Sequence, residues 1–241
     1  MCRKTMTITN KTRINEWFVP QFGPLRFRIF VGLLFLPYTG MCISIAVIGS
    51  MFASDITWDR VGAIALIYAL ALGVSAHVAD SLGSKKTKPW GSYFNKAQLQ
   101  ILMAATLAGA YAIGIYYIAL FVPLLAVIAT LEGFFLFAYN FEAFSGRFHN
   151  NFWFAVSWGV LPVLAGYVMQ TNSISILVLT ASCLTGLVSY VEIRISRPYK
   201  QMKQSGSDPV RAKRLENWLK AISLGTIASA LALLVYRIIF S

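Results

Sequence analysis

The chain has 241 residues, of which 57% are hydrophobic and 12% are charged, against about a quarter charged in an ordinary soluble domain. Apolar stretches of about 18 residues or more recur along its length, each long enough to cross a bilayer core of about 30 Å. This composition excludes a water-soluble globular fold and predicts an all-α integral membrane protein, a bundle of about seven transmembrane helices.

The predicted elements begin with an N-terminal segment, residues 1–29, which is expected to be cytoplasmic or interfacial. Within it, residues 14–30 mix aromatic side chains with two prolines and two arginines, which suits a bent segment at the headgroup level. Residues 30–241 are predicted to form one transmembrane helical domain. Its seven spans are expected at 30–52, 61–78, 99–118, 119–139, 152–168, 174–191 and 219–240.

Short connections are expected between the third and fourth spans, near residues 116–123, and between the fifth and sixth, at residues 171–173. The stretch before the last span reads as a helix start, with Asp208 as the N-cap and Pro209 at the first helical position. That helix is predicted to run on into the last span.

The positive charges predict the orientation, because cytoplasmic loops of membrane proteins retain lysine and arginine. Nineteen of the 21 basic residues lie in the N-terminal segment and in the connections after the second, fourth and sixth spans. Only Arg60 and Arg237 fall on the other side. We therefore expect a cytoplasmic N-terminus, an external C-terminus and a place in the cell membrane. The net charge of +12 is explained by topology and by attraction to membrane lipids, so no nucleic-acid partner is expected.

Polar residues gather at the predicted cytoplasmic ends of three spans. His77 and Asp80 lie three residues apart and so share one face of a helix. Glu142, Arg147 and His149 follow the fourth span, and Glu192 ends the sixth. Carboxylates and cations at such a mouth are typical of a site for a metal ion and a phosphate-bearing anion. The other interpretation is that polar residues collect wherever helices reach the membrane surface.

Glu132 differs from these residues because it lies inside the fourth span. An ionisable group at that depth costs on the order of 2.5 to 3.5 kcal/mol, so it is expected to face a cavity or a partner. A protonated glutamate bonded to a neighbouring helix backbone is the other interpretation. The surrounding aromatic residues suit either an apolar tunnel that stabilises a cation through its π faces or ordinary packing with an interfacial belt.

Two stretches resemble the UbiA superfamily of membrane prenyltransferases, over about residues 25–200. Ala76, His77, Asp80 and Ser84 stand at the four positions of that family's Asn-Asp-x-x-Asp-x-x-x-Asp motif, and a basic, proline-containing loop follows. Residues 139–167 are similar to the family's next conserved loop and span. The chain departs from the family in having seven predicted spans instead of nine. It also has one acid in each motif, with Glu192 followed by Ser196 in the second.

The resemblance implies transfer of a polyprenyl group from its diphosphate to an acceptor at the cytoplasmic face. It implies Mg²⁺ held by Asp80 and Glu192, with His77 as a third catalytic residue. The residues implied to bind diphosphate are Lys85, Lys86, Lys88, Asn140 and Arg147. Those expected to line the isoprenoid site are Glu132, Phe137, Tyr139 and Trp158.

Two alternatives stay open. Because imidazole suits Zn, Cu or Fe better than Mg²⁺, His77, Asp80, Glu142 and His149 could form a transition-metal site, or the protein could hold no metal. The chain could also be a catalytically inactive, UbiA-like structural or lipid-binding subunit of a larger membrane complex. Small residues along 104–114 suit the close helix packing that other membrane subunits would require.

Overall fold

The computed structural model describes residues 13–83 and 93–240, in which helices are joined by turns and loops and no strand occurs. The elements in chain order are η1 Arg13–Asn15, α1 Leu25–Leu33, α2 Leu36–Met51, α3 Trp58–Tyr68, η2 Ala69–Ala76, α4 His77–Gly83, α5 Lys96–Leu120, α6 Leu125–Asn140, η3 Phe144–Gly146, α7 Asn151–Ala155, η4 Val156–Val160, α8 Leu161–Thr171, α9 Ile176–Ser205 and α10 Pro209–Phe240.

Within the described residues, six helical stretches are long and apolar enough to cross a membrane: Leu25–Met51, Trp58–Gly83, Lys96–Leu120, Asn151–Thr171, Ile176–Ser205 and Pro209–Phe240. The prediction of a multi-pass helical membrane protein is therefore confirmed. The stretch expected as a fourth span is the apolar helix α6, of 16 residues, or about 24 Å at 1.5 Å per residue. Because α6 is shorter than a bilayer core, the count of seven crossings stays a prediction.

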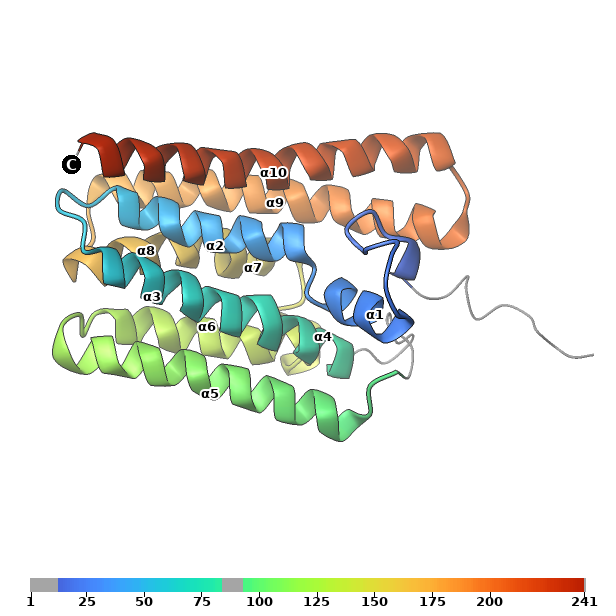
Figure 1. Cartoon of the computed structure of the whole chain (residues 1–241), viewed down its shortest axis with the longest axis horizontal. Coiled ribbons are helices and arrows are strands. Elements are labelled where there is room, and N and C mark those ends of the chain that lie inside the picture. Colours follow the sequence, from blue (N-terminus) through green and yellow to red (C-terminus); the bar gives the residue numbers. More distant parts are fainter. Residues whose placement is uncertain (1–12, 84–92, 241) are drawn as a thin grey trace, which may run out of the picture.

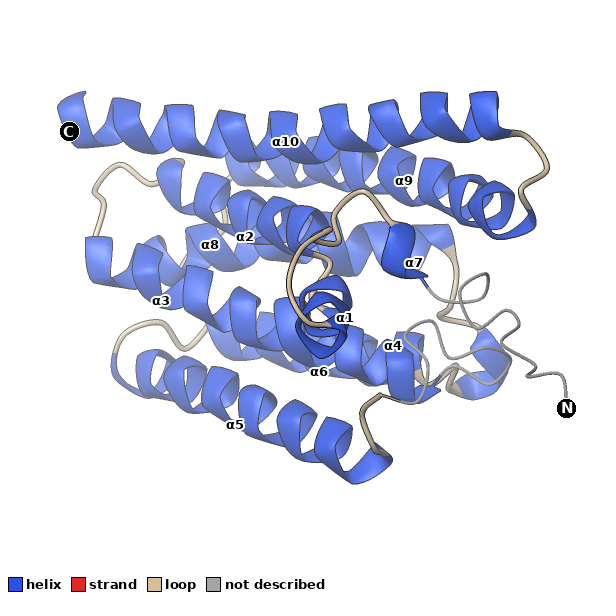
Figure 2. Ribbon diagram, turned by 45° about the vertical axis from the view of Figure 1, so that its right-hand side comes forward, coloured by secondary structure: helices blue, strands red, loops and turns tan. Residues whose placement is uncertain are grey.

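The long helices run side by side in a bundle (Figures 1 and 2). α10 and α9 form one flank, α2, α8 and α3 lie in the middle, and α6 and α5 form the other flank. The α9–α10 turn, α1 and α4 lie at one end of the bundle. The α2–α3, α5–α6 and α8–α9 connections lie at the other end, together with the end of α10. The short α5–α6 and α8–α9 connections agree with the predicted turns.

The centre of the bundle depends on contact between backbones. A Cβ atom at Gly166 of α8 would collide with the carbonyl oxygen of Ala46 in α2. A Cβ at Gly49 of α2 would likewise collide with the carbonyl oxygen of Val163 in α8. The Ser50 hydroxyl donates to the Gly166 carbonyl at 3.0 Å across the same contact. α2 and α8 can approach this closely because glycine has no side chain there.

Two helices widen into π-helical segments, η2 and η4, where the backbone hydrogen bonds are displaced. After the second segment, Pro162 of α8 has no N–H to bond the carbonyl of Trp158 in η4, and the Ser189 hydroxyl of α9 donates to that carbonyl instead, at 3.1 Å. The Thr185 hydroxyl of α9 donates to the Gly159 carbonyl at 2.9 Å. Side chains of α9 thus satisfy the oxygens that the wide turn releases.

The first apolar stretch is not the single helix over 30–52 that the sequence predicts. Phe35 adopts the left-handed conformation (φ 46°, ψ 48°) and separates α1 from α2. That conformation is uncommon for a bulky residue. It is stabilised by tertiary contacts, because the Phe35 ring packs with Phe18 and lies 4.6 Å from the Arg13 guanidinium carbon. The N-terminal segment therefore packs on the bundle, with Phe18 and Val19 buried.

The α9–α10 turn behaves as predicted. Asp208 accepts a hydrogen bond from the backbone N–H of Arg211 at 2.9 Å, as an N-cap does, and α10 continues without a break from Pro209 to Phe240. The two basic residues at the other end of the bundle bond backbone carbonyls. Arg60 donates to Met169 and Gln170, and Arg237 donates to Ala53 and Ser54. These hydrogen bonds connect helix ends whose last carbonyl groups have no N–H partner within the helix.

Candidate functional site

A cavity of about 220 Å³ with polar walls lies between α2, α4, α6, η4 and α9, and we call it the polar cavity. Its lining residues are Phe35, Tyr38, Ala76, His77, Asp80, Tyr139, Asn140, His149, Phe154, Trp158, Glu192, Ile193, Ser196, Arg197 and Lys200. They come from parts of the chain that are far apart in sequence. The polar cavity brings together two acids, two histidines, an arginine and a lysine.

The first helix of the polar cavity is α4, which begins at His77 directly after η2. His77 and Asp80, three residues apart, both face the cavity as their spacing predicts. Gly83, at the end of α4, lies against the end of α6, where a Cβ would collide with the carbonyl oxygen of Asn140. This close approach brings Asn140 and Tyr139 of α6 to the same cavity.

The hydrogen-bond partners of His77 define which ring nitrogen carries a proton. Thr39 Oγ1 donates its one hydrogen to the Leu34 carbonyl at 2.6 Å, so it must accept from His77 Nε2 at 3.2 Å. A neutral His77 then has its lone pair on Nδ1. A neutral His149 has the opposite tautomer, because its Nδ1 donates to the Tyr139 carbonyl at 2.9 Å and the lone pair is then on Nε2.

The opposite wall of the cavity is one face of α9. Glu192, Ser196 and Lys200 follow one another at four-residue intervals, so they lie in a row along the helix, and Arg197 is next to this row. Glu192 is only 4% exposed. The Lys200 ammonium interacts electrostatically with both Asp80 and Glu192, and also with Glu16 and Arg13. The lysine is therefore within electrostatic range of carboxylates from two different helices.

Aromatic rings form the remaining wall. The His77 imidazole stacks on Phe35 with a centroid distance of 4.7 Å and lies 5.3 Å from the Trp158 ring. Trp158 in turn stacks on Phe154 at 5.4 Å. Tyr139 stacks on His149 at 4.5 Å. An apolar or cationic group in the cavity would thus face π surfaces on one side and charged groups on the other.

The structure gathers some of the predicted site residues and separates others. His77, Asp80, Tyr139, Asn140, His149, Trp158 and Glu192 all line the polar cavity. Glu142 and Arg147 do not; both are exposed in the connection between α6 and α7, where Glu142 adopts a positive φ. Phe137 lies on the exposed outer face of α6. Lys85, Lys86 and Lys88 lie outside the described residues.

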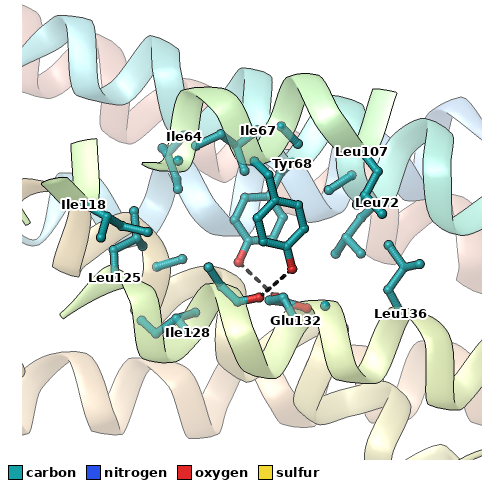
Figure 3. Close-up of a pocket in the computed structure, with 17 residues that line it drawn as sticks. Ile64, Ile67, Tyr68, Leu72, Leu107, Ile118, Leu125, Ile128, Glu132 and Leu136 are labelled. Atoms are coloured by element: carbon teal, nitrogen blue, oxygen red, sulfur yellow. Dashed lines mark hydrogen bonds between the residues drawn. The ribbon is translucent and has the colours of Figure 1, made fainter. Parts of the chain in front are cut away.

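Glu132 lines a second, apolar cavity of about 70 Å³ between α3, α5 and α6 (Figure 3). The Tyr68 hydroxyl donates to its Oε1 at 2.9 Å, and the Ser157 hydroxyl lies 3.1 Å from its Oε2. The carboxyl group is thus bonded to two side-chain hydroxyls of neighbouring helices. This arrangement agrees with the expectation that Glu132 faces a cavity or a partner, whereas its partners are hydroxyls and not the helix backbone of the other interpretation. It does not line the polar cavity that holds Tyr139 and Trp158.

The polar cavity holds part of each metal site considered from the sequence. Among the described residues, its carboxylates are Asp80 and Glu192. Mg²⁺ is usually bound by one or two carboxylates together with oxygens of the substrate's phosphates. For the transition-metal set, Glu142 lies elsewhere. No group of three His, Cys, Asp or Glu side chains in residues 13–83 and 93–240 is arranged to hold a metal ion.

Sequence reasoning missed several groups at this end of the bundle. Arg197 and Lys200 were counted only as topology signals, although Lys200, eight residues after Glu192, lies on the same helix face and Arg197 also lines the cavity. It also missed a buried network beside the cavity. There, the Tyr199 hydroxyl donates to Glu16 Oε2 at 2.6 Å, and Lys213 and Lys220 both bond Glu216 Oε1 at 2.8 Å.

The fold and the cavity define a multi-pass helical membrane protein with a charged, aromatic-walled chamber at one end of its bundle. No protein-family model matches the chain, and no curated protein or solved structure is similar to it. The residues of the chamber are therefore the basis for any functional conclusion.

Proposed function

We propose that the protein binds an isoprenyl diphosphate in the polar cavity and transfers its prenyl group to an acceptor, as a UbiA-like enzyme of the cell membrane. The observation that carries the proposal is the meeting of Asp80 and Glu192, from α4 and α9, in one cavity with two cations and an aromatic wall. This combination suits a ligand with an anionic head and an unsaturated apolar tail.

In this proposal, the diphosphate lies against α9, where Arg197 and Lys200 neutralise its oxygens. Asp80 of α4 and Glu192 of α9 line the same cavity, and their negative charges interact with the Lys200 ammonium. Asn140, whose side-chain amide donates to the Leu136 carbonyl at 2.7 Å, lines the cavity between the two helices. The allylic carbon then faces the rings of Phe35, His77 and Trp158.

The reaction breaks the bond between the allylic carbon and the diphosphate oxygen, and both electrons leave with the diphosphate. Cationic side chains stabilise the negative charge that develops on the leaving group, and the π faces stabilise the positive charge on the prenyl group. The acceptor forms the new bond to the allylic carbon and releases a proton. The lone pair on Nδ1 of His77 is the base proposed to receive that proton.

The test is a transfer assay with purified protein in lipid nanodiscs, using labelled isoprenyl diphosphates of several chain lengths with and without MgCl₂. We expect release of diphosphate in the presence of a lipid-soluble aromatic or alcohol acceptor. His77→Gln should lower the rate while diphosphate binding is retained. Absence of binding and release for every chain length would exclude the proposed function.

The alternative, a structural subunit of a membrane complex, is favoured by one observation. Ala104, Ala108 and Ala112 lie exposed along one face of α5, where a further helix could pack closely. If this is the function, mild solubilisation should recover the chain in constant ratio with other membrane proteins. Replacing Ala108 with leucine should break that association. A chain that purifies alone and transfers prenyl groups would rule it out.

A further inference from the structure

The face of α9 in the polar cavity carries more positive charge than the resemblance to prenyltransferases implies. Along this face, the acid Glu192 is followed by the hydroxyl of Ser196, the guanidinium of Arg197 and the ammonium of Lys200. The two carboxylates of the cavity are thus matched by two side-chain cations from one helix. The negative charge of the cavity is therefore already balanced by side chains of this chain before any ligand or metal ion binds.

Arg197 supplies the more specific observation. Its Nη2 atom is buried and has no hydrogen-bond partner among the described residues. Buried guanidinium N–H groups normally donate hydrogen bonds, and one without an acceptor is costly. The Arg197 side chain also interacts with the Tyr139 side chain. A ligand oxygen in the cavity would supply the acceptor that Nη2 lacks.

Lys200 places a positive charge near the carboxylates at which a metal ion would bind. Its ammonium interacts electrostatically with Asp80 on α4 and Glu192 on α9, which are the carboxylates that line the cavity among the described residues. A divalent cation between these acids would therefore be repelled by this positive charge.

We propose that the polar cavity binds a diphosphate group without a divalent metal, with Arg197 Nη2 and Lys200 supplying the positive charge. The proposal rests on the proposed binding of an isoprenyl diphosphate at this site. In this site Asp80 and Glu192 offset part of the cationic charge and do not coordinate Mg²⁺. Arginine suits the task because its planar N–H groups match phosphate oxygens.

The experiment measures the Kd of farnesyl diphosphate for the detergent-solubilised chain, in excess EDTA and in millimolar MgCl₂. The two Kd values are expected to agree within about threefold. Inorganic diphosphate is the second probe. Its weaker binding would show how much of the affinity comes from the headgroup and how much from the tail. Arg197→Gln and Lys200→Met are each expected to weaken binding in EDTA by about tenfold or more, equivalent to about 1.4 kcal/mol.

Asp80→Asn should change the affinity for diphosphate in opposite directions under the two mechanisms. If the acid holds Mg²⁺, the variant must bind diphosphate more weakly. In the metal-free site, loss of a negative charge beside the anion should tighten binding in EDTA. Because this substitution keeps the side-chain shape, a thermal unfolding curve without ligand provides the control for folding.

The outcomes separate the two proposals. Binding that requires MgCl₂ and disappears in EDTA would overturn the metal-free site and leave the proposed prenyl transfer standing. Retained affinity in Arg197→Gln and Lys200→Met would also overturn it. Absence of binding in both EDTA and MgCl₂ would overturn the proposed function itself, and the metal-free site with it.

Discussion

At the scale of single residues, Glu132 shows how an acid is accommodated inside an apolar helix. Its carboxyl group lies beside the hydroxyls of Tyr68 and Ser157, which come from α3 and η4. Each hydrogen bond offsets part of the cost of removing the acid from water. The tyrosine is buried, so this pair also joins α3 to α6 inside the bundle.

Tyr68→Phe should therefore destabilise the protein by about 1 to 3 kcal/mol, because it leaves one carboxyl oxygen of Glu132 without its donor. The measurement is the thermal unfolding midpoint in detergent. Tyr111→Phe is the matched control, since it removes a hydroxyl from the same cavity. The Tyr111 hydroxyl donates to the backbone carbonyl oxygen of Ala129 in α6. That oxygen also accepts a hydrogen bond within the helix, so it keeps a partner when the hydroxyl is removed. Equal losses in the two variants would contradict this account.

A second residue-scale contact holds the N-terminal segment. The Tyr199 hydroxyl donates to Glu16 Oε2, and Arg13 pairs with the other oxygen of Glu16 at 3.4 Å. All three side chains are buried. The N-terminal segment is thus attached to α9 by a polar contact that is shielded from water.

Tyr199→Phe should loosen that attachment, because a hydrogen bond to a charged group contributes about 1.5 to 3 kcal/mol. The readout is the rate of tryptic cleavage after Arg26, which is expected to increase. Cleavage after Arg147, in a different exposed connection, should not change. Tyr236→Phe, on the exposed face of α10, provides the control variant. Cleavage at Arg26 that is no faster than in the wild type would show that Glu16 is held by other contacts.

At the scale of helices, the packing of α2 against α8 depends on glycine. Ala46 and Val163 present carbonyl oxygens where a side chain on Gly166 or Gly49 would have to lie. Backbone atoms cannot move aside as a flexible side chain can, so the two helices would have to separate. The distance between α2 and α8 is therefore set by these two positions.

Gly166→Ala is expected to lower stability by about 2 kcal/mol or more through this overpacking. Gly62→Ala is the matched control, because Gly62 also lies within a helix and has open space where the Cβ would go. Alanine favours helix over glycine by about 0.5 to 1 kcal/mol, so Gly62→Ala should be neutral or stabilising. Both are measured by thermal unfolding in the same detergent. Similar behaviour of the two variants would contradict the close contact.

At the scale of the whole molecule, the charges separate along the bundle. Among the described residues, most lysines and arginines lie at the end of the bundle that holds the α9–α10 turn and the α6–α7 connection. Arg60 and Arg237 lie at the opposite end. Both of these arginines are bonded to backbone carbonyls. The alternation of helix ends agrees with the predicted loops, and the positive-inside rule predicts that the basic end is cytoplasmic.

Cysteine accessibility tests this orientation. In a variant without its native cysteines, Ser173→Cys should react with a membrane-impermeant maleimide in intact cells, whereas Ser207→Cys should react only after the membrane is opened. Both serines are exposed, in the α8–α9 and α9–α10 connections respectively. Equal reaction from outside would show that the two connections do not lie on opposite sides. The reverse pattern would invert the predicted orientation.

Properties that depend on local sequence were predictable from the residues alone. Helix positions follow from apolar length, the start of α10 follows from Asp208 and Pro209, and the basic end follows from where charges interrupt apolar runs. The spacing of His77 and Asp80 was also sufficient to place them on one face. These features depend on residues within a few turns of one another, so they can be inferred without knowing the fold.

Only the tertiary structure determined which side chains lie beside one another. It placed Arg197 and Lys200 with Asp80, moved Glu132 to a separate cavity and excluded Glu142 and Arg147 from the polar one. It also broke the first span at Phe35, where contacts with distant residues stabilise an unfavourable backbone conformation. The physical reason is that these outcomes depend on how helices approach one another. That approach is controlled by backbone contacts such as Gly166 with Ala46, which no hydropathy or charge pattern records.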